Sequence, residues 1–108
     1  MDNNDVYYML KYNYVSDIEE RRPPFNLAHW NHLLQFREEG IIERGGRLNN
    51  GTGAIFIIKY NKNNEKSHPE YIGKNDPFYI NKLMTFEFND FSDGSVDFLK
   101  NKISSTKI

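Results

Sequence analysis

The stretch Ala-Ile-Phe-Ile-Ile-Lys-Tyr at residues 54–60 is the clearest β-forming segment of the chain. It consists mainly of β-branched and aromatic side chains, and Asn49-Asn50-Gly51-Thr52-Gly53 before it is typical of a turn. Residues 41–48 predict the partner strand of a hairpin, with an interruption or a bulge at Gly45-Gly46. This hairpin is the centre of the predicted fold.

A strand and a helix are expected before the hairpin. Residues 5–14 are dense in aromatic and β-favouring side chains and predict a strand. Pro23-Pro24 interrupts regular structure, and a helix is expected from about Pro24 to Glu39, with Gly40 as its terminator. The apolar residues of this helix recur at helical spacing and predict its buried face; they are Leu27, Trp30, Leu33, Leu34 and Phe36.

A second helix and a last strand are expected after the hairpin. Residues 67–70 fit a capping box, in which Ser67 caps the third helical N–H and Glu70 reaches back to the Ser67 N–H. This short helix is expected to run to about Lys74, where Asn75-Asp76-Pro77 ends it. Residues 82–91 predict the last strand.

The resulting order is β-α-β-β-α-β, which is the ferredoxin-like plan of the α+β class. It predicts a four-stranded antiparallel sheet with both helices on one face. The domain is expected to cover residues 5–91, followed by a polar tail at 92–108. In that tail only Val96, Phe98 and Leu99 are able to dock, and we expect fraying from Ser104 onward.

Composition narrows the class of protein. The chain has 108 residues, a formal net charge of −1 and no cysteine. These values disfavour nucleic-acid partners and exclude disulfide scaffolds, thiol catalysis and thiolate metal sites. No apolar run reaches the roughly 18 residues of a membrane span, and the first residues are not typical of a signal peptide. We therefore expect an intracellular, cytoplasmic domain with no membrane partner.

Both faces of the predicted sheet carry apolar side chains. On residues 5–14, Val6, Tyr8 and Leu10 alternate with Tyr7 and Met9. On residues 54–60, Ile55 and Ile57 alternate with Phe56 and Ile58. One face is expected to be covered by the helices, and an apolar second face favours a homodimer packed sheet to sheet. Alternation does not tell which of the two sets faces the helices.

The chain contains three histidines, His29, His32 and His68. On a helical wheel, His29 falls within the apolar arc near its edge, and His32 lies just outside it. His29 is thus either an acid–base group in a partly apolar site or a core-edge histidine bonded to a backbone carbonyl. His29 and His32 are three residues apart, but no third ligand is evident, so no metal and no cofactor are predicted.

Several short motifs together produce a resemblance to a known family. They are Arg22-Pro23, His29, Glu39-Gly40, Gly46 and Asp76-Pro77-Phe78. Their order and spacing, from about Val6 to Phe91, resemble the YCII-related (YciI-like) family. The resemblance implies a dimeric α+β barrel and a site between helix and sheet, with a histidine and the Asp-Pro aspartate as a dyad. Transferred to this chain, the dyad is His29 and Asp76.

The chain departs from the family pattern at three places. Arg47 stands where a proline commonly follows the glycine pair, and Lys82 stands where a glycine often precedes the last strand. An extended approach, residues 23–26, puts Arg22 seven residues before His29 rather than about three. Arg22 and Arg47 are the candidate substrate-binding residues, and Arg47 is equally compatible with a solvated charge at a strand end.

Two hypotheses for the function follow. The first is a small-molecule enzyme of proton-transfer type, resembling a lyase or an isomerase, with His29 as general acid and base and Asp76 orienting it. The second is a non-catalytic dimer of the same fold that binds a small ligand or a protein. Geometry discriminates between them, since catalysis requires that the His29–Asp76 pair reach solvent, whereas a sealed pair is typical of a structural role.

Overall fold

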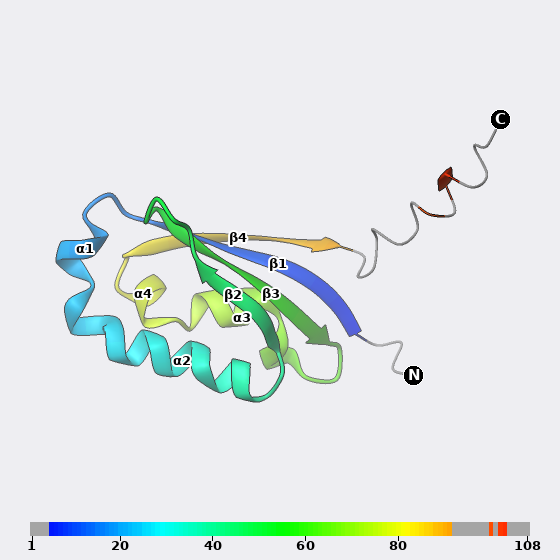
Figure 1. The fold of residues 1–108 in the computed structure, drawn as a ribbon. Helices are drawn as coiled ribbons and strands as arrows, with labels where there is room; N and C mark the ends of the chain where they lie inside the picture. The colour runs from blue at the N-terminus through cyan, green and yellow to red at the C-terminus, as the bar shows by residue number, and fades with distance from the viewer. Residues whose placement is uncertain (1–4, 92–99, 101, 104–108) are drawn as a thin grey trace.

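The computed structural model describes residues 5–91, 100 and 102–103. It has an α+β fold with one four-stranded antiparallel sheet in the order β2-β3-β1-β4 (Figure 1). The strands are β1 (Asp5–Tyr14), β2 (Ile42–Arg47), β3 (Gly53–Asn61) and β4 (Met84–Phe91). The β2–β3 hairpin of the prediction is confirmed, and the strand order is compatible with the ferredoxin-like plan.

Helices cover one face of this sheet (Figure 1). The two predicted helices are present as α2 (Asn26–Glu38) and α3 (Pro69–Lys74). Two helices of a single turn were not predicted, and they are α1 (Ile18–Arg21) and α4 (Pro77–Ile80). Short 3₁₀ turns precede α2 and α3, at Pro23–Phe25 and Glu65–Ser67. The loop after β1, which contains Arg22, and the segment before β4, which contains Asp76, therefore have regular structure. Both polar residues contact Phe78.

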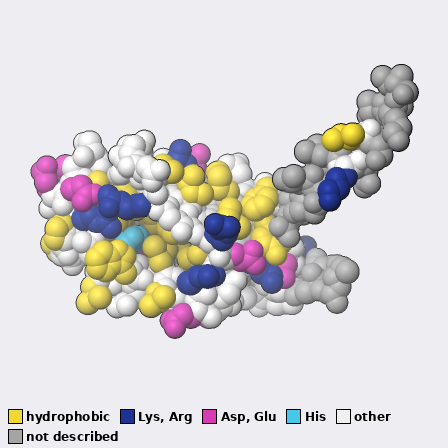
Figure 2. All heavy atoms as spheres, viewed as in Figure 1, with side chains coloured by type: hydrophobic (Ala, Val, Ile, Leu, Met, Phe, Trp, Pro, Cys, Tyr) yellow, Lys and Arg dark blue, Asp and Glu magenta, His cyan; other side chains and the backbone are white. Residues whose placement is uncertain are grey.

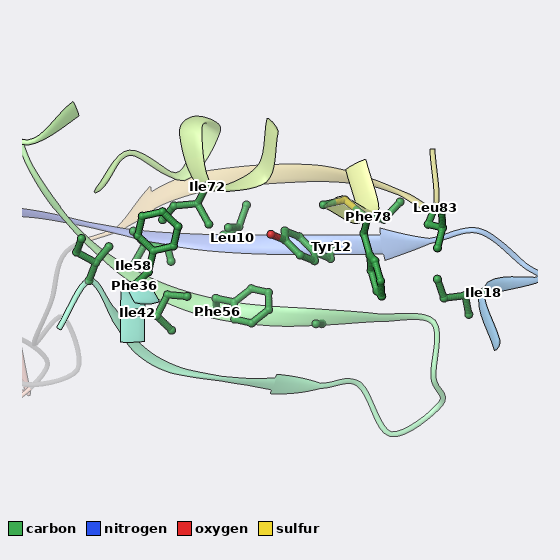
Figure 3. Packing of buried hydrophobic residues seen from close by; sticks show 13 residues of the cluster. Leu10, Tyr12, Ile18, Phe36, Ile42, Phe56, Ile58, Ile72, Phe78 and Leu83 are labelled. Atoms are coloured by element: carbon green, nitrogen blue, oxygen red, sulfur yellow. The ribbon is translucent and has the colours of Figure 1, made fainter. Parts of the chain in front are cut away.

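The core lies between the sheet and the helices (Figure 3). Leu10 and Tyr12 of β1, with Phe56 and Ile58 of β3, are buried and point toward the helices. The set that includes Tyr7, Met9, Ile55 and Ile57 therefore lies on the open face, where each is partly exposed. The alternation predicted for both strands is confirmed, and the structure decides which set faces the helices. The buried residues that form this core are Leu10, Tyr12, Ile18, Phe36, Ile41, Ile42, Ala54, Phe56, Ile58, Ile72, Phe78, Leu83 and Met84.

The predicted position of the bulge is wrong. The register of β2 against β3 shifts between Ile42 and Arg44, whereas Gly45 and Gly46 pair regularly with Phe56 and Ile55. The first glycine has a packing role instead, because a Cβ on Gly45 would lie 2.4 Å from Cδ1 of Phe56. The Phe56 ring therefore covers the backbone of β2, which only glycine at position 45 permits.

The predicted buried face of α2 is confirmed at Leu33 and Phe36 and is wrong at its other three positions. Leu27, Trp30 and Leu34 are 69%, 54% and 52% exposed, whereas His29 and Phe36 are buried. Leu33 packs against the core from the same side as these two. Apolar spacing alone favoured the leucine and tryptophan stripe, but hydrogen bonding and ring stacking of His29 turn its side of the helix toward the sheet.

The predicted capping box at α3 is wrong by one residue. Pro69 is the first helical residue, so His68 becomes the N-cap and its Nδ1 accepts a hydrogen bond from the Glu70 N–H at 3.0 Å. The Ser67 hydroxyl is buried and donates to the Asn64 carbonyl at 2.6 Å. Ser67 thus stabilises the preceding loop rather than the helix.

The predictions for the tail concern Val96, Phe98, Leu99 and residues 104–108, all of which lie outside the described residues. Within the described part of the chain, no helix has the length and apolar character needed to cross a membrane.

We expect Gly53→Ala to destabilise the protein by about 3 kcal/mol, because overpacking at a rigid contact forces the backbone to move. A Cβ at Gly53 would lie 2.0 Å from the Tyr12 carbonyl oxygen, in the paired strands β1 and β3. Gly46→Ala is the matched control, since a Cβ there meets no atom within 4 Å. Urea denaturation followed by circular dichroism measures both, and equal stability of the two variants would contradict the prediction.

Candidate active site

Asp76 lies at the centre of a buried polar cluster. It is the N-cap of α4, where the Asp-Pro step places its Oδ1 2.9 Å from the Phe78 backbone N–H. The Tyr12 hydroxyl donates to Oδ2 at 2.8 Å, and the carboxylate is 0% exposed. A buried carboxylate without partners is costly, so these donors are what permit its charge in the core.

His29 is the third partner of Asp76. Its Nδ1 lies 2.8 Å from Oδ1 and 2.9 Å from Oδ2. A carboxylate only accepts, so the network assigns a proton to Nδ1. The imidazole also stacks on Phe78, with ring centroids 3.7 Å apart and planes inclined by 5°. Its plane and tautomer are therefore set by two separate contacts.

The Nε2 edge of His29 is the side of the ring away from Asp76. Among the described residues no group is hydrogen bonded to this atom, and only Arg22 Nη1 is a buried side-chain nitrogen or oxygen without a partner. The pair is nearly sealed, since the side chains of His29 and Asp76 are 4% and 0% exposed, which is closer to the sealed pair of a structural role than to an open site. In the same view as Figure 1, a histidine reaches the surface directly beside a group of Lys and Arg side chains (Figure 2).

Tyr12 belongs to this cluster, and sequence reasoning did not identify it. Burial raises the pKa of the Tyr12 hydroxyl well above its ordinary value, and the neighbouring Asp76 charge raises it further. The hydroxyl therefore stays protonated and serves as a donor to Asp76. Strand alternation is the pattern that could have identified Tyr12. Position 12 lies on the same strand face as Leu10 and directs a polar atom into an apolar layer.

Arg22 lies against the same aromatic ring as His29. Its guanidinium carbon is 5.2 Å from the Phe78 centroid and 5.8 Å from the Tyr14 centroid, and the residue is 8% exposed. Its Nε donates to Asn26 Oδ1 at 2.7 Å, which ties it to the first turn of α2. The longer approach through residues 23–26 includes a 3₁₀ turn at Pro23–Phe25, and Arg22 before it contacts the Phe78 ring that stacks on His29.

Arg47 and Tyr14 form the rim of the site. Arg47, at the end of β2, is half exposed and bonds to Glu19 of α1, which also lies 3.9 Å from Arg22 Nη1. Burial raises the pKa of Tyr14, while the guanidiniums of Arg22 and Arg47 oppose that rise. Neither Tyr14 nor Glu19 was singled out in the sequence, because neither is part of a recognisable motif.

The structure brings His29, Asp76 and Arg22 together at one ring, with Arg47 at the rim. His32, the other histidine of α2, is directed elsewhere, and its Nε2 lies 2.7 Å from the Ile72 carbonyl oxygen. Within the described ranges, no three His, Cys, Asp or Glu side chains are grouped closely enough to hold a metal ion. The expected dyad thus shares the Phe78 ring with one buried guanidinium.

Comparison of the sequence with protein-family models and with curated proteins finds no match.

We expect Tyr12→Phe to weaken the dependence of stability on alkaline pH. The raised pKa means that the folded state keeps the proton above pH 10, the ordinary value at which the unfolded chain releases it. Stability from this hydroxyl is complete below pH 10 and is lost as the pH rises toward the folded pKa. Tyr12→Phe should lower the free energy of unfolding by about 2 kcal/mol at pH 7 and show a shallower decline above pH 10.

Denaturant titrations between pH 7 and pH 11 measure this difference. Tyr71→Phe is the control, because Tyr71 is 37% exposed and removing its hydroxyl leaves Asp76 unchanged. Parallel pH profiles for Tyr12→Phe and the wild type would show that the buried hydroxyl does not carry the effect.

Proposed function

We propose that this protein is a small-molecule enzyme of proton-transfer type, in which His29 is the general acid and base and Asp76 its partner. The observation that carries the proposal is the asymmetry of the imidazole. Nδ1 is held by a fully buried carboxylate, whereas none of the described residues is hydrogen bonded to Nε2, and the side chain is 4% exposed. A ring nitrogen without a hydrogen bond to any described residue is available to take up and return a proton.

The proposed step is removal of a proton from a carbon next to a carbonyl group. The C–H bond breaks, its electron pair moves into the carbonyl to form an enolate, and Nε2 takes the proton. Asp76 stabilises the imidazolium that results, and Nε2 then returns the proton to the same or a neighbouring atom. Phe78 holds the ring plane during both transfers, because its ring is stacked on the imidazole. Positioned acid–base groups contribute about 10²–10⁴-fold to such reactions.

The resemblance to the YCII-related family supports this proposal. Its expected dyad residues lie 47 positions apart in the sequence and are in direct contact in the structure. The sheet order and the helices on one face are compatible with the ferredoxin-like half of a dimeric α+β barrel.

We expect the wild type to exchange deuterium into small ketones, aldehydes, lactones or oxo acids dissolved in D₂O. Proton NMR of such a panel measures the loss of the signal next to the carbonyl. His29→Gln and Asp76→Asn should each lower the rate by about 100-fold, and the double variant should be no slower, since the two groups act as one unit.

His32→Gln is the matched control, because this histidine lies on the same helix but contacts Ile72 rather than the dyad. Exchange by wild type no faster than by His29→Gln, for every compound of the panel, would sink the acid–base assignment. Ligand-induced shifts at the site without exchange would favour the non-catalytic binding module instead.

We further propose that two copies pack through the open sheet face. Among the described elements none covers this face, which carries Tyr7, Met9, Ile55, Ile57 and Phe91 (Figure 1). Charges of both signs accompany them, since Lys11 is paired in register with Glu87 and Lys59 lies 3.6 Å from Asp5. A two-fold axis brings a patch onto itself, so mixed charges allow a second copy to fit where a single-sign patch would repel it.

Ile57→Asp is expected to give a folded monomer, because it places a charge in the centre of the open face without touching the core. Light scattering measures the mass, and circular dichroism confirms the fold. Leu34→Asp is the control, since Leu34 is 52% exposed on α2, on the helix side of the sheet. A wild type that stays monomeric at micromolar concentration, or a dimer broken only by Leu34→Asp, would contradict the sheet-to-sheet arrangement.

A further inference from the structure

The Nη1 atom of Arg22 is an unsatisfied donor in a nearly closed site. Its side chain is 9% exposed, and within the described chain it carries the only buried side-chain nitrogen or oxygen atom that lacks a hydrogen bond. Guanidinium groups remain charged at any ordinary pH and have donors on every nitrogen. A buried cationic donor without an acceptor is unfavourable in itself, which indicates that an acceptor is supplied from outside.

The guanidinium is held in place rather than free to turn to water. Asn26 takes the Nε hydrogen at 2.7 Å, and the faces of Tyr14 and Phe78 lie beside the cation. Phe78 also stacks on His29, so the guanidinium and the imidazole both contact this ring. The unsatisfied donor therefore belongs to a residue that shares an aromatic neighbour with the expected dyad.

Glu19 shows what kind of group fits between the two arginines. Its side chain is 65% exposed on α1, bonds to Arg47 and has Oε1 3.9 Å from Arg22 Nη1. That second separation is too long for a hydrogen bond. A carboxylate thus already lies between the guanidiniums but satisfies only one of them, and its exposure leaves it able to move away.

We propose that Arg22 and Arg47 bind the carboxylate of a small organic acid, which displaces Glu19 and brings the adjoining carbon next to His29 Nε2. A monocarboxylate carries a single negative charge, as Glu19 does. Guanidinium groups bind carboxylates through bidentate hydrogen bonds. The rings of Tyr14 and Phe78 favour an organic body over a bare inorganic anion. The assignment of this acid as a substrate rests on the proposed function, whereas its binding does not.

The test is titration of the His29→Gln protein with acetate, butyrate and benzoate, followed by NMR, with inorganic phosphate as a separate arm. Removing His29 separates binding from catalysis. In this background, Arg22→Gln should weaken carboxylate binding by about tenfold or more, since it removes a charge-assisted contact. Glu19→Gln should strengthen it several-fold, because the internal competitor loses its charge. Glu19 is exposed, so this second variant is informative even where Arg22→Gln does not fold.

Arg21→Gln is the matched control. It changes the net charge by the same amount on the neighbouring residue, which is exposed and pairs with Asp17 rather than with Glu19. Equal weakening by Arg21→Gln and Arg22→Gln, unchanged or weaker binding in Glu19→Gln, or phosphate bound as tightly as butyrate would each overturn the carboxylate site. Carboxylate binding without deuterium exchange in the wild type would retain this site and refute the acid–base function. Deuterium exchange of neutral ketones as fast as that of oxo acids would retain the acid–base function and refute the carboxylate site.

Discussion

The burial of one negative charge, on Asp76, is the constraint on which the rest of the structure depends. Its carboxylate takes hydrogen bonds from Tyr12 of β1, from His29 of α2 and from the Phe78 N–H of α4. Loss of a partner from such a cluster leaves a buried charge uncompensated, at a cost of several kcal/mol. β1, α2 and α4 are therefore joined by hydrogen bonds to the same carboxylate, and these bonds fix the rotation of α2 about its own axis.

That rotation explains why the leucine and tryptophan stripe of α2 faces outward. Hydrophobic burial alone favours the side of the helix with Leu27, Trp30 and Leu34, yet these side chains are more than half exposed. The side of α2 that is buried instead keeps the apolar packing of Leu33 and Phe36, and it adds the stacked and hydrogen-bonded His29. Rotating α2 to bury the leucine and tryptophan stripe would remove the His29 hydrogen bond from the buried Asp76 carboxylate, which is costly.

Exposure increases in steps across the candidate site. The side chains of Asp76, His29 and Arg22 are 0%, 4% and 9% exposed, and Arg47 at the rim is 49% exposed. In the proposed enzyme, this gradient would keep the His29–Asp76 pair in a weakly screening interior, and an anionic ligand would meet the outer arginine first. The site lies on the helix side of the sheet, so a dimer formed through the opposite face would leave it accessible.

The sequence by itself determined the β-α-β-β-α-β order, the hairpin and the alternation of β1 and β3, because turn residues and strand periodicity act over a few neighbouring positions. It also predicted the dyad through the motif resemblance, although the two residues are 47 positions apart. Only the tertiary structure decided which face of α2 is buried, that Tyr12 completes the cluster, and that Arg22 lies beside Phe78 with one donor unsatisfied. The physical reason is that the free energy of a buried charge depends on partners from distant segments, which no local pattern records.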